Sequence, residues 1–347
     1  MKTKSTVIFG TLIIVLSVSV LCSFPRTAWC TAAYDAERER AFFKGKVVTI
    51  IVPSKVGGWF DTWARLLQPA FRERLKTTVV VDNVPGAGRK KAMNRLFSAR
   101  PDGTVFGVVN RANMITEMIG EEGVRYKMVE FTWMGNTSNM ARLLFVSRKS
   151  PYKTFSDFIN YKNRIKVGVN GSGSVAWYDS IILKKTFKKD NVNIVSAYEG
   201  SGDIYRAILQ GEVDATVAVE NEVVNLPPEE ISVLLQLGGP RGYLPGINVP
   251  RLADVAPPDA SDYVKLLGEQ YYMARFWAAP PKMAPHRAKF MRDTFEEICK
   301  DPKFIAVMKK AGARVDFTRG EKIQEMVKSH MNQPKYIIDL FKGTEAH

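Results

Sequence analysis

The residues best placed to do chemistry are a pair of glycines, Gly57 and Gly58, between an apolar run and a helical pattern. The run from Val47 reads as a buried strand into Pro53, and Trp59 to Asp61 open the helix. Unpaired N–H groups and a partial positive charge at a helix N-terminus stabilise an anion. Glycines, which lack Cβ, let the backbone approach a ligand closely. The stretch predicts a socket for a solute carboxylate.

A second stretch of the same kind holds Gly171, Ser172, Gly173 and Ser174. It again separates a predicted strand from a predicted helix and adds two hydroxyl groups. Two sockets facing across a cleft suit a solute with two acidic groups, or with one acid and one polar end. Two tight turns without a ligand are the alternative interpretation, and the residues alone leave both open.

Three side chains beside these turns have two possible roles each. Asp61 suits a helix cap, because aspartate caps helices well, and it also lies close enough to contact a ligand. Trp59 and Trp177 suit either a flat wall for the solute or the apolar core. If both indoles face the cleft, an aromatic carboxylate is favoured over citrate.

Charged residues follow several of the predicted turns and strands. The run Arg89 to Lys91 offers cationic contacts to a highly charged anion, or a solvated helix start. Arg111 ends the third strand, and its guanidinium fork fits a carboxylate; Arg142 is the weaker candidate. Glu220 and Glu222 follow another strand, where an acid suits an amino group on the solute or simply faces water.

The elements that must position these residues alternate between strand and helix, which predicts a doubly wound α/β fold in two similar halves. A parallel pair of strands with a right-handed helical crossover is expected at the start of the first half, and the order of strand, Gly/Ser loop and helix repeats in the second. The first half has strands at 47–52, 78–83 and 105–110, with helices at 60–75 and 89–98. The second has strands at 141–147, 165–169, 194–197 and 215–219, with helices at 155–161, 175–188 and 204–209. Residues 238–258 are expected to be irregular, 271–279 extended, and 283–300, 302–311 and 321–340 helical. Pro334 is a point at which the last of these helices can break.

Length and the N-terminal segment indicate an exported protein of two domains. The chain has 347 residues, 46% hydrophobic residues and a net charge of +15, which fits a solvated surface or a preference for anionic solutes. Residues 1–33 have a basic start, an apolar run and small residues up to Ala32 and Ala33, as a cleaved signal peptide does. Lipid attachment at Cys22 or Cys30 is disfavoured, because neither follows a small residue. Cys299 on an apolar helical face is expected to be a buried structural thiol.

Several functional classes lack their motifs. The G-x-G-x-x-G, G-x-x-x-x-G-K-[ST] and G-x-S-x-G patterns are missing, and His286, His330 and His347 are expected to be surface or helix-cap residues. Neither a metal site nor a cofactor is predicted, and the dispersed basic residues do not indicate nucleic acid. An α/β enzyme is therefore the disfavoured alternative.

An ordered set of stretches resembles the solute-binding proteins of the tripartite tricarboxylate transporter family, also known as Bug receptors. The set consists of IIVPSKVGGWFD, VVVDNVPGAG, the turn Pro101–Thr104, AYEGSGDIYRAILQGEVDA, LPGINVPRLADVAP, FWAAPPKMAP and KKAGARVDF. It covers nearly the whole chain after residue 33. Each motif alone is unspecific, whereas their order is specific.

The resemblance implies a two-lobed, type II periplasmic-binding-protein-like fold, with a mixed or parallel sheet in each lobe and hinge strands between them. Lobe 1 is expected at 34–139 and 273–347, and lobe 2 at 140–272. The implied function is a monomeric periplasmic receptor, not an enzyme, that delivers a di- or tricarboxylate, acidic amino acid or aromatic acid to large and small permease subunits. A sensor for a signalling system is the alternative. The expected binding residues are Gly57, Gly58, Trp59, Asp61, Gly88, Arg111, Gly171, Ser172, Gly173, Ser174, Trp177 and Gly200.

Overall fold

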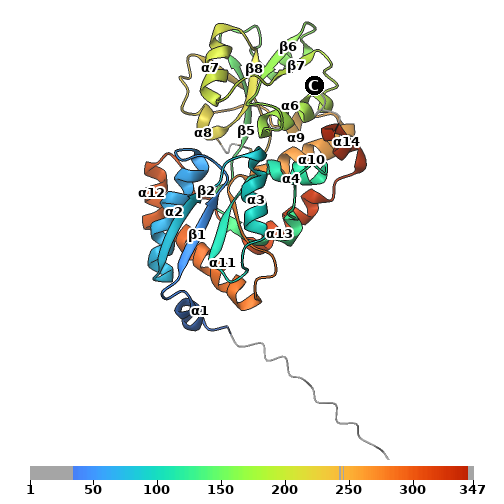
Figure 1. The fold of residues 1–347 in the computed structure, drawn as a ribbon. Coiled ribbons are helices and arrows are strands. Elements are labelled where there is room, and N and C mark those ends of the chain that lie inside the picture. Colours follow the sequence, from blue (N-terminus) through green and yellow to red (C-terminus); the bar gives the residue numbers. More distant parts are fainter. Residues whose placement is uncertain (1–33, 242–243, 245, 343–347) are drawn as a thin grey trace, which may run out of the picture. The chain divides into compact units, whose positions relative to one another are not determined.

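Two β-sheets, each flanked by helices, organise the chain (Figure 1). The structure is a computed structural model that describes residues 34–241, 244 and 246–342. The predicted signal peptide, with Cys22 and Cys30, lies outside the described residues, as does His347. Within the described part of the chain, no helix combines the length and the apolar character needed to cross a membrane.

The first sheet has six strands in the order β11-β4-β10-β3-β1-β2. Its strands are β1 (Val47–Val52), β2 (Thr78–Asn83), β3 (Val105–Val109), β4 (Thr132–Asn136), β10 (Phe276–Ala279) and β11 (Thr318–Arg319). Strand β1 pairs in parallel with β2 and β3, whereas β10 runs antiparallel between β3 and β4. The predicted parallel β1–β2 pair is confirmed.

Apolar side chains alternate between the two faces of this sheet, as the two-residue period of a strand requires. Ile50 and Trp277 join a core with α2 (Trp59–Leu75), α11 (Pro285–Lys300) and α12 (Pro302–Lys310). Their neighbours Ile51 and Phe276 join a second core with α3 (Lys90–Phe97) and α13 (Gly320–Met331). Helix α1 (Ala36–Phe42) is followed by Phe43, which is buried in the first core. The sheet is thus covered on both faces.

The second sheet has five strands in the order β7-β6-β8-β5-β9. They are β5 (Arg142–Ser147), β6 (Ile165–Gly168), β7 (Val192–Val195), β8 (Ala215–Val219) and β9 (Ile231–Gln236). One face packs on α5 (Phe155–Asn160), α6 (Val175–Thr186) and α10 (Ser261–Glu269). The other packs on α7 (Ser201–Gln210) and α8 (Glu220–Val223).

Both sheets share one strand order. The first sheet contains the series β2-β1-β3-β10-β4, and the second contains β7-β6-β8-β5-β9. In each series the first three strands are parallel, and the fourth is antiparallel to its neighbours. The antiparallel strand is β10 in one sheet and β5 in the other. Strand β5 is the first strand after the chain crosses from the first sheet to the second, and β10 is the first strand after it returns. The two similar halves expected from the sequence are therefore present as two mixed α/β sheets.

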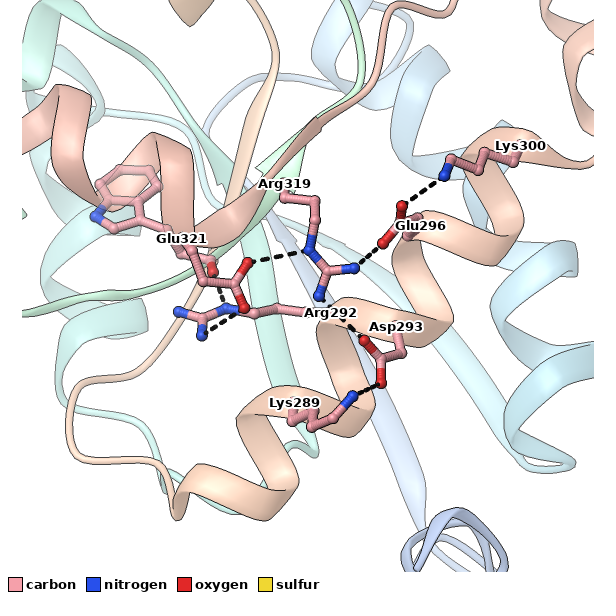
Figure 2. Close-up of polar contacts among 8 residues, drawn as sticks. Lys289, Arg292, Asp293, Glu296, Lys300, Arg319 and Glu321 are labelled. Atoms are coloured by element: carbon pink, nitrogen blue, oxygen red, sulfur yellow. Dashed lines mark hydrogen bonds and ion pairs between the residues drawn. The ribbon is translucent and has the colours of Figure 1, made fainter. Parts of the chain in front are cut away.

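An ion-pair network fastens the edge strand β11 to α11 (Figure 2). Arg319 pairs with Glu296, with Asp293 at 3.2 Å and with Glu321 at 3.3 Å. Lys289 and Lys300 extend the network along α11. Charges on a two-residue edge strand also protect it from pairing with another chain.

The last helix, α14 (Lys335–Lys342), packs near α10 and α4 (Ala112–Met118). The rings of Phe341 and Tyr178 meet edge to face at 5.1 Å, and Ile337 is fully buried in the same core. This core also contains Ile115 of α4. Ile115, Ile337 and Phe341 were assigned to lobe 1, whereas Tyr178 was assigned to lobe 2, so the two predicted lobes share this core. The boundaries themselves stay a prediction.

Several predicted elements are corrected by the structure. The run 271–279 is a 3-10 helix, η4 (Gln270–Met273), followed by the short strand β10, because the chain turns before it enters the sheet. The 321–340 segment, in contrast, is broken at Pro334 as expected: α13 ends at Met331 and α14 begins at Lys335. The segment 238–258, expected to be irregular, contains the short helix α9 (Leu252–Val255), and a 3-10 helix begins at its last residue. Elements not predicted were α1, α4, α8, α9, α10, β4, β9 and β11, and the 3-10 helices η1 (Ala87–Arg89), η2 (Met128–Glu130), η3 (Pro258–Ala260) and η4.

Two predictions about individual side chains have different outcomes. Cys299 is 2% exposed and packs in the core beneath α11, so the buried thiol is confirmed; burial raises its pKa. His330 is only 1% exposed and lies 3.3 Å from Glu269, so it is not a surface residue, although it does lie in the last turn of α13. His286 is partly exposed, near Glu39.

Candidate functional site

A cavity of about 910 Å³ is lined by residues that follow strands of both sheets. Ser54 follows β1, Asn110 follows β3, Asn170 follows β6 and Asn221 follows β8. Open α/β sheets bind ligands at the carboxyl ends of their parallel strands, and four such ends meet here. The cavity has the size of a small-molecule site.

The turn between β1 and α2 is held in place by Asp61, which is 1% exposed. One carboxylate oxygen accepts from the Gly57 amide at 2.9 Å and from Arg65 at 2.9 Å, and the other accepts from Asn83 at 3.0 Å. The hydrogen bonds from Arg65, Gly57 and Asn83 outweigh the effect of burial and lower the Asp61 pKa. Asp61 therefore orients the turn, while Gly58 and Trp59 form the cavity wall.

Two helices from the second half also begin at the cavity. Ser174 caps α6 by accepting from the Trp177 amide at 3.2 Å, and it lines the cavity together with Ser172 and Gly173. Ser201, the first residue of α7, lines it as well. With α2, three helices direct their N-termini and their partial positive charge toward one space.

Two arginines flank the ring of Phe60 in the cavity wall. The guanidinium carbon of Arg275 lies 5.1 Å from the ring centroid, and that of Arg89 lies 6.0 Å from it. Arg89 has φ of 71°, which is unusual for a residue with a Cβ, and burial lowers its pKa. Its neighbours are used differently: Lys90 pairs with Glu121, and Lys91 is exposed. Of the basic run, only Arg89 lines the cavity.

A buried ion cluster lies behind the cavity wall. Asp179 is fully buried; its carboxylate accepts from Arg142 at 2.6 Å and lies 3.9 Å from Arg111. Burial lowers the Arg111 pKa to about 9, although Asp179 acts in the opposite direction. Arg111 also donates to the Gln270 carbonyl at 2.8 Å. Arg142 reaches the cavity, whereas Arg111 is committed to this cluster.

The two glutamates after β8 have separate environments. Glu222 lines the cavity. Glu220 instead accepts from the Ala141 amide at 2.7 Å, where the chain enters β5, and lies 3.7 Å from Arg314. Burial raises the Glu220 pKa to about 7.

The structure brings most of the predicted binding residues to one cavity. Those that line it are Gly58, Trp59, Gly88, Ser172, Gly173, Ser174 and Trp177. Trp177 is only 7% exposed and packs on Tyr178, so it belongs mainly to the core. The predicted residues that are not among the lining residues are Gly57, Asp61, Arg111, Gly171 and Gly200.

Sequence reasoning missed the cavity residues Phe60, Asn110, Thr216, Asn221 and Arg275. A signal was available for Arg275, because it is a lone charge in the run Tyr271–Ala279 and charged residues are rarely buried without a function or a partner. A signal was also available for Asn221, because it lies between Glu220 and Glu222, which were considered since they follow the predicted strand 215–219.

Residues 63–342 match the model of the tripartite tricarboxylate transporter family receptor, TctC. The chain belongs to this receptor family. The family resemblance is thereby confirmed. Because the family consists of solute-binding receptors rather than enzymes, the prediction that this receptor is not an enzyme also holds.

Individual relatives are distant in sequence. A curated protein of Agrobacterium vitis, described as a UPF0065 protein in the TAR-I ttuE-ttuC' intergenic region, is 26% identical over 202 residues. That match covers 57% of this chain and 56% of the relative, so the chain spans about half the length of the curated relative it matches.

Solved structures confirm the two-sheet fold. A TctC solute-binding protein from Polaromonas, without ligand, has a TM-score of 0.69 at 16% identity, covering 87% of this chain and 99% of that one. MatC from Rhodopseudomonas palustris, with bound malate, has a TM-score of 0.60 at 22% identity, covering 85% and 98%. A second R. palustris protein, with adipate, has a TM-score of 0.63 at 19% identity, covering 85% and 97%.

Proposed function

We propose that this receptor captures a small organic carboxylate in the cavity and delivers it to a membrane importer with large and small permease subunits. Capture would take place in the periplasm, after export and cleavage near Ala32 and Ala33. The receptor would act as a monomer and without a cofactor.

The observation that carries this proposal is the convergence of three helix N-termini and two guanidinium groups at one cavity. Helices α2, α6 and α7 begin there, and Arg89 and Arg275 line the same wall. Helix N-termini and guanidinium groups both stabilise carboxylates, and they do so more strongly where water is partly excluded. A neutral sugar or an amine would leave these positive charges unused.

The arrangement favours a solute with two polar ends. Helix α2 packs on the first sheet, whereas α6 and α7 pack on the second. A molecule that reaches both can hold the two halves together. Related proteins with malate and with adipate, both dicarboxylates, are consistent with this class.

Binding of carboxylates is tested by thermal unfolding of the chain that begins after residue 33. The panel contains malate, adipate, citrate, glutamate and benzoate, with glucose and putrescine as non-acidic probes. A ligand at a hundredfold excess over its Kd should stabilise the fold by about 2.7 kcal/mol. Stabilisation by glucose or putrescine alone would refute the proposal.

A bulky side chain at the second turn tests the position of the site. Ser172→Tyr places a ring where α6 begins and should weaken binding of the best carboxylate by at least about tenfold, since the anion loses its approach to the helix amides. Ser156→Tyr is the matched control, because Ser156 is exposed on α5 and does not line the cavity. Equal affinity of both variants would place the site elsewhere.

A further inference from the structure

Arg275 is a buried cation whose hydrogen-bonding capacity is only partly used. It is 8% exposed, and one terminal nitrogen donates to the Ala274 carbonyl at 2.7 Å. Among the described residues, its Nε has no hydrogen-bond partner. A buried guanidinium with an unmatched N–H costs stability. Because this Nε is shielded from water, the side chain must turn toward the cavity before an acceptor of a solute can bind it.

Asn221 presents the same situation with a neutral side chain. It is 8% exposed and lines the cavity after β8, yet neither its amide nitrogen nor its amide oxygen has a partner in the described part of the chain. Both atoms are shielded from water, so the amide must rotate toward the cavity to meet a solute. It then offers one acceptor and a donating NH₂ group.

Glu222 adds a negative charge to this corner of the cavity. Burial lowers the Arg275 pKa to about 10, while the charge of Glu222 acts in the opposite direction and Arg142 lowers it further. Arg275 and Glu222 both line the cavity, so a solute bound there can meet both charges. A cation and an anion with an amide beside them match a group that itself carries both charges.

We infer that Arg275, Asn221 and Glu222 form a subsite for a carboxylate with a protonated amine on the adjacent carbon. Arg275 and the Asn221 NH₂ donate to the carboxylate, and Glu222 and the Asn221 oxygen accept from the ammonium group. The second acidic group of the solute then lies toward Arg89 or the start of α6. This inference rests on the proposed function and narrows it to an acidic amino acid.

The test uses diacids that differ only in the substituent next to one carboxylate. Succinate, malate and aspartate form one series, glutarate, 2-hydroxyglutarate and glutamate a second, and adipate with 2-aminoadipate a third. Calorimetry should show the amino acid as the tightest ligand at whichever length binds, by at least about tenfold over the unsubstituted diacid, because hydrogen bonds to charged groups are the strong ones.

Variants separate the subsite from general anion binding. Glu222→Gln should lower the affinity for the amino acid to about that for the hydroxy acid. The affinity for the unsubstituted diacid should change little. Asn221→Leu should reduce the preference for both substituted ligands. Glu229→Gln, an exposed residue outside the cavity with the same change of charge, should alter none of the affinities.

The outcomes distinguish the two levels of the argument. If an unsubstituted diacid binds most tightly, or if Glu222→Gln leaves the preference unchanged, the subsite is refuted while carboxylate capture stands. If no carboxylate of the full panel binds, the proposed function fails, and the subsite fails with it.

Discussion

Removing the charge of Asp179 is predicted to be among the most damaging single changes to this receptor. Its carboxylate is fully buried, lies 2.6 Å from the Arg142 guanidinium and 3.9 Å from that of Arg111, and has no access to water. Asp179→Asn keeps the shape of the side chain and one acceptor oxygen. The change therefore isolates the charge.

The magnitude follows from the two cations that would remain. Breaking a buried ion pair by removing one partner costs about 3–5 kcal/mol, because the other charge stays desolvated and unpaired. Asparagine keeps a neutral hydrogen bond to Arg142, so we expect about 3 kcal/mol. At a slope of about 3 kcal/mol per molar urea, the unfolding midpoint should fall by about 1 M.

The assay is equilibrium urea unfolding of the chain that begins after residue 33, followed by tryptophan fluorescence and circular dichroism. Asp259→Asn is the matched control. Asp259 pairs with Lys188 at 2.8 Å, but both side chains are largely exposed, so the midpoint should not move measurably. The reasoning is refuted if Asp179→Asn shifts the midpoint no more than Asp259→Asn does.

Three further predictions concern packing, pH and closure. Gly107→Ala should destabilise by about 1–3 kcal/mol in the same assay, because its Cβ would lie 2.6 Å from the Ile51 carbonyl oxygen. Gly268→Ala, where nothing lies within 4 Å, should instead stabilise by about 0.5–1 kcal/mol; similar effects of the two changes would contradict this. Since burial raises the Glu220 pKa to about 7, the native state loses stability as pH rises from the unfolded value of about 4.5 through 7. Glu220→Gln should therefore match the parent at pH 4.5 and exceed it by about 1–2 kcal/mol at pH 8.5, less than the full shift because water screens part of the charge. Finally, the saturating carboxylate should reduce the radius of gyration in small-angle scattering, and identical curves with and without it would exclude closure of the two halves.

Local patterns predicted the strands and helices that bear the candidate site. The bounds of β2 and β8 agree with the sequence to the residue, because each is a short β-branched run between clear turn signals. The starts of α2 and α6 followed from glycine- and serine-bearing turns. These features depend on neighbours in the chain.

Other parts of the site depend on tertiary contacts, which sequence periodicity does not reveal. Strand β4 carries glycine and asparagine, so it did not stand out as a strand; its pairing with β10 and β11 makes it one. Arg111 and Arg142 looked like equivalent carboxylate ligands. In the structure both lie near the buried Asp179, and of the two only Arg142 also lines the cavity. Arg275 was missed for the same reason.

The position of β10 between β3 and β4 has a consequence for how the chain is made. The strands of the second sheet are contiguous in sequence from Arg142 to Gln236, so that sheet can form as soon as its segment is complete. The first sheet lacks its middle strand until residues 276–279 leave the ribosome. Until then the edges of β3 and β4 have no partner between them, and the long sequence separation makes this closure slow. The first sheet therefore stays incomplete through most of the synthesis, and its unpaired strand edges are surfaces that a chaperone would have to cover.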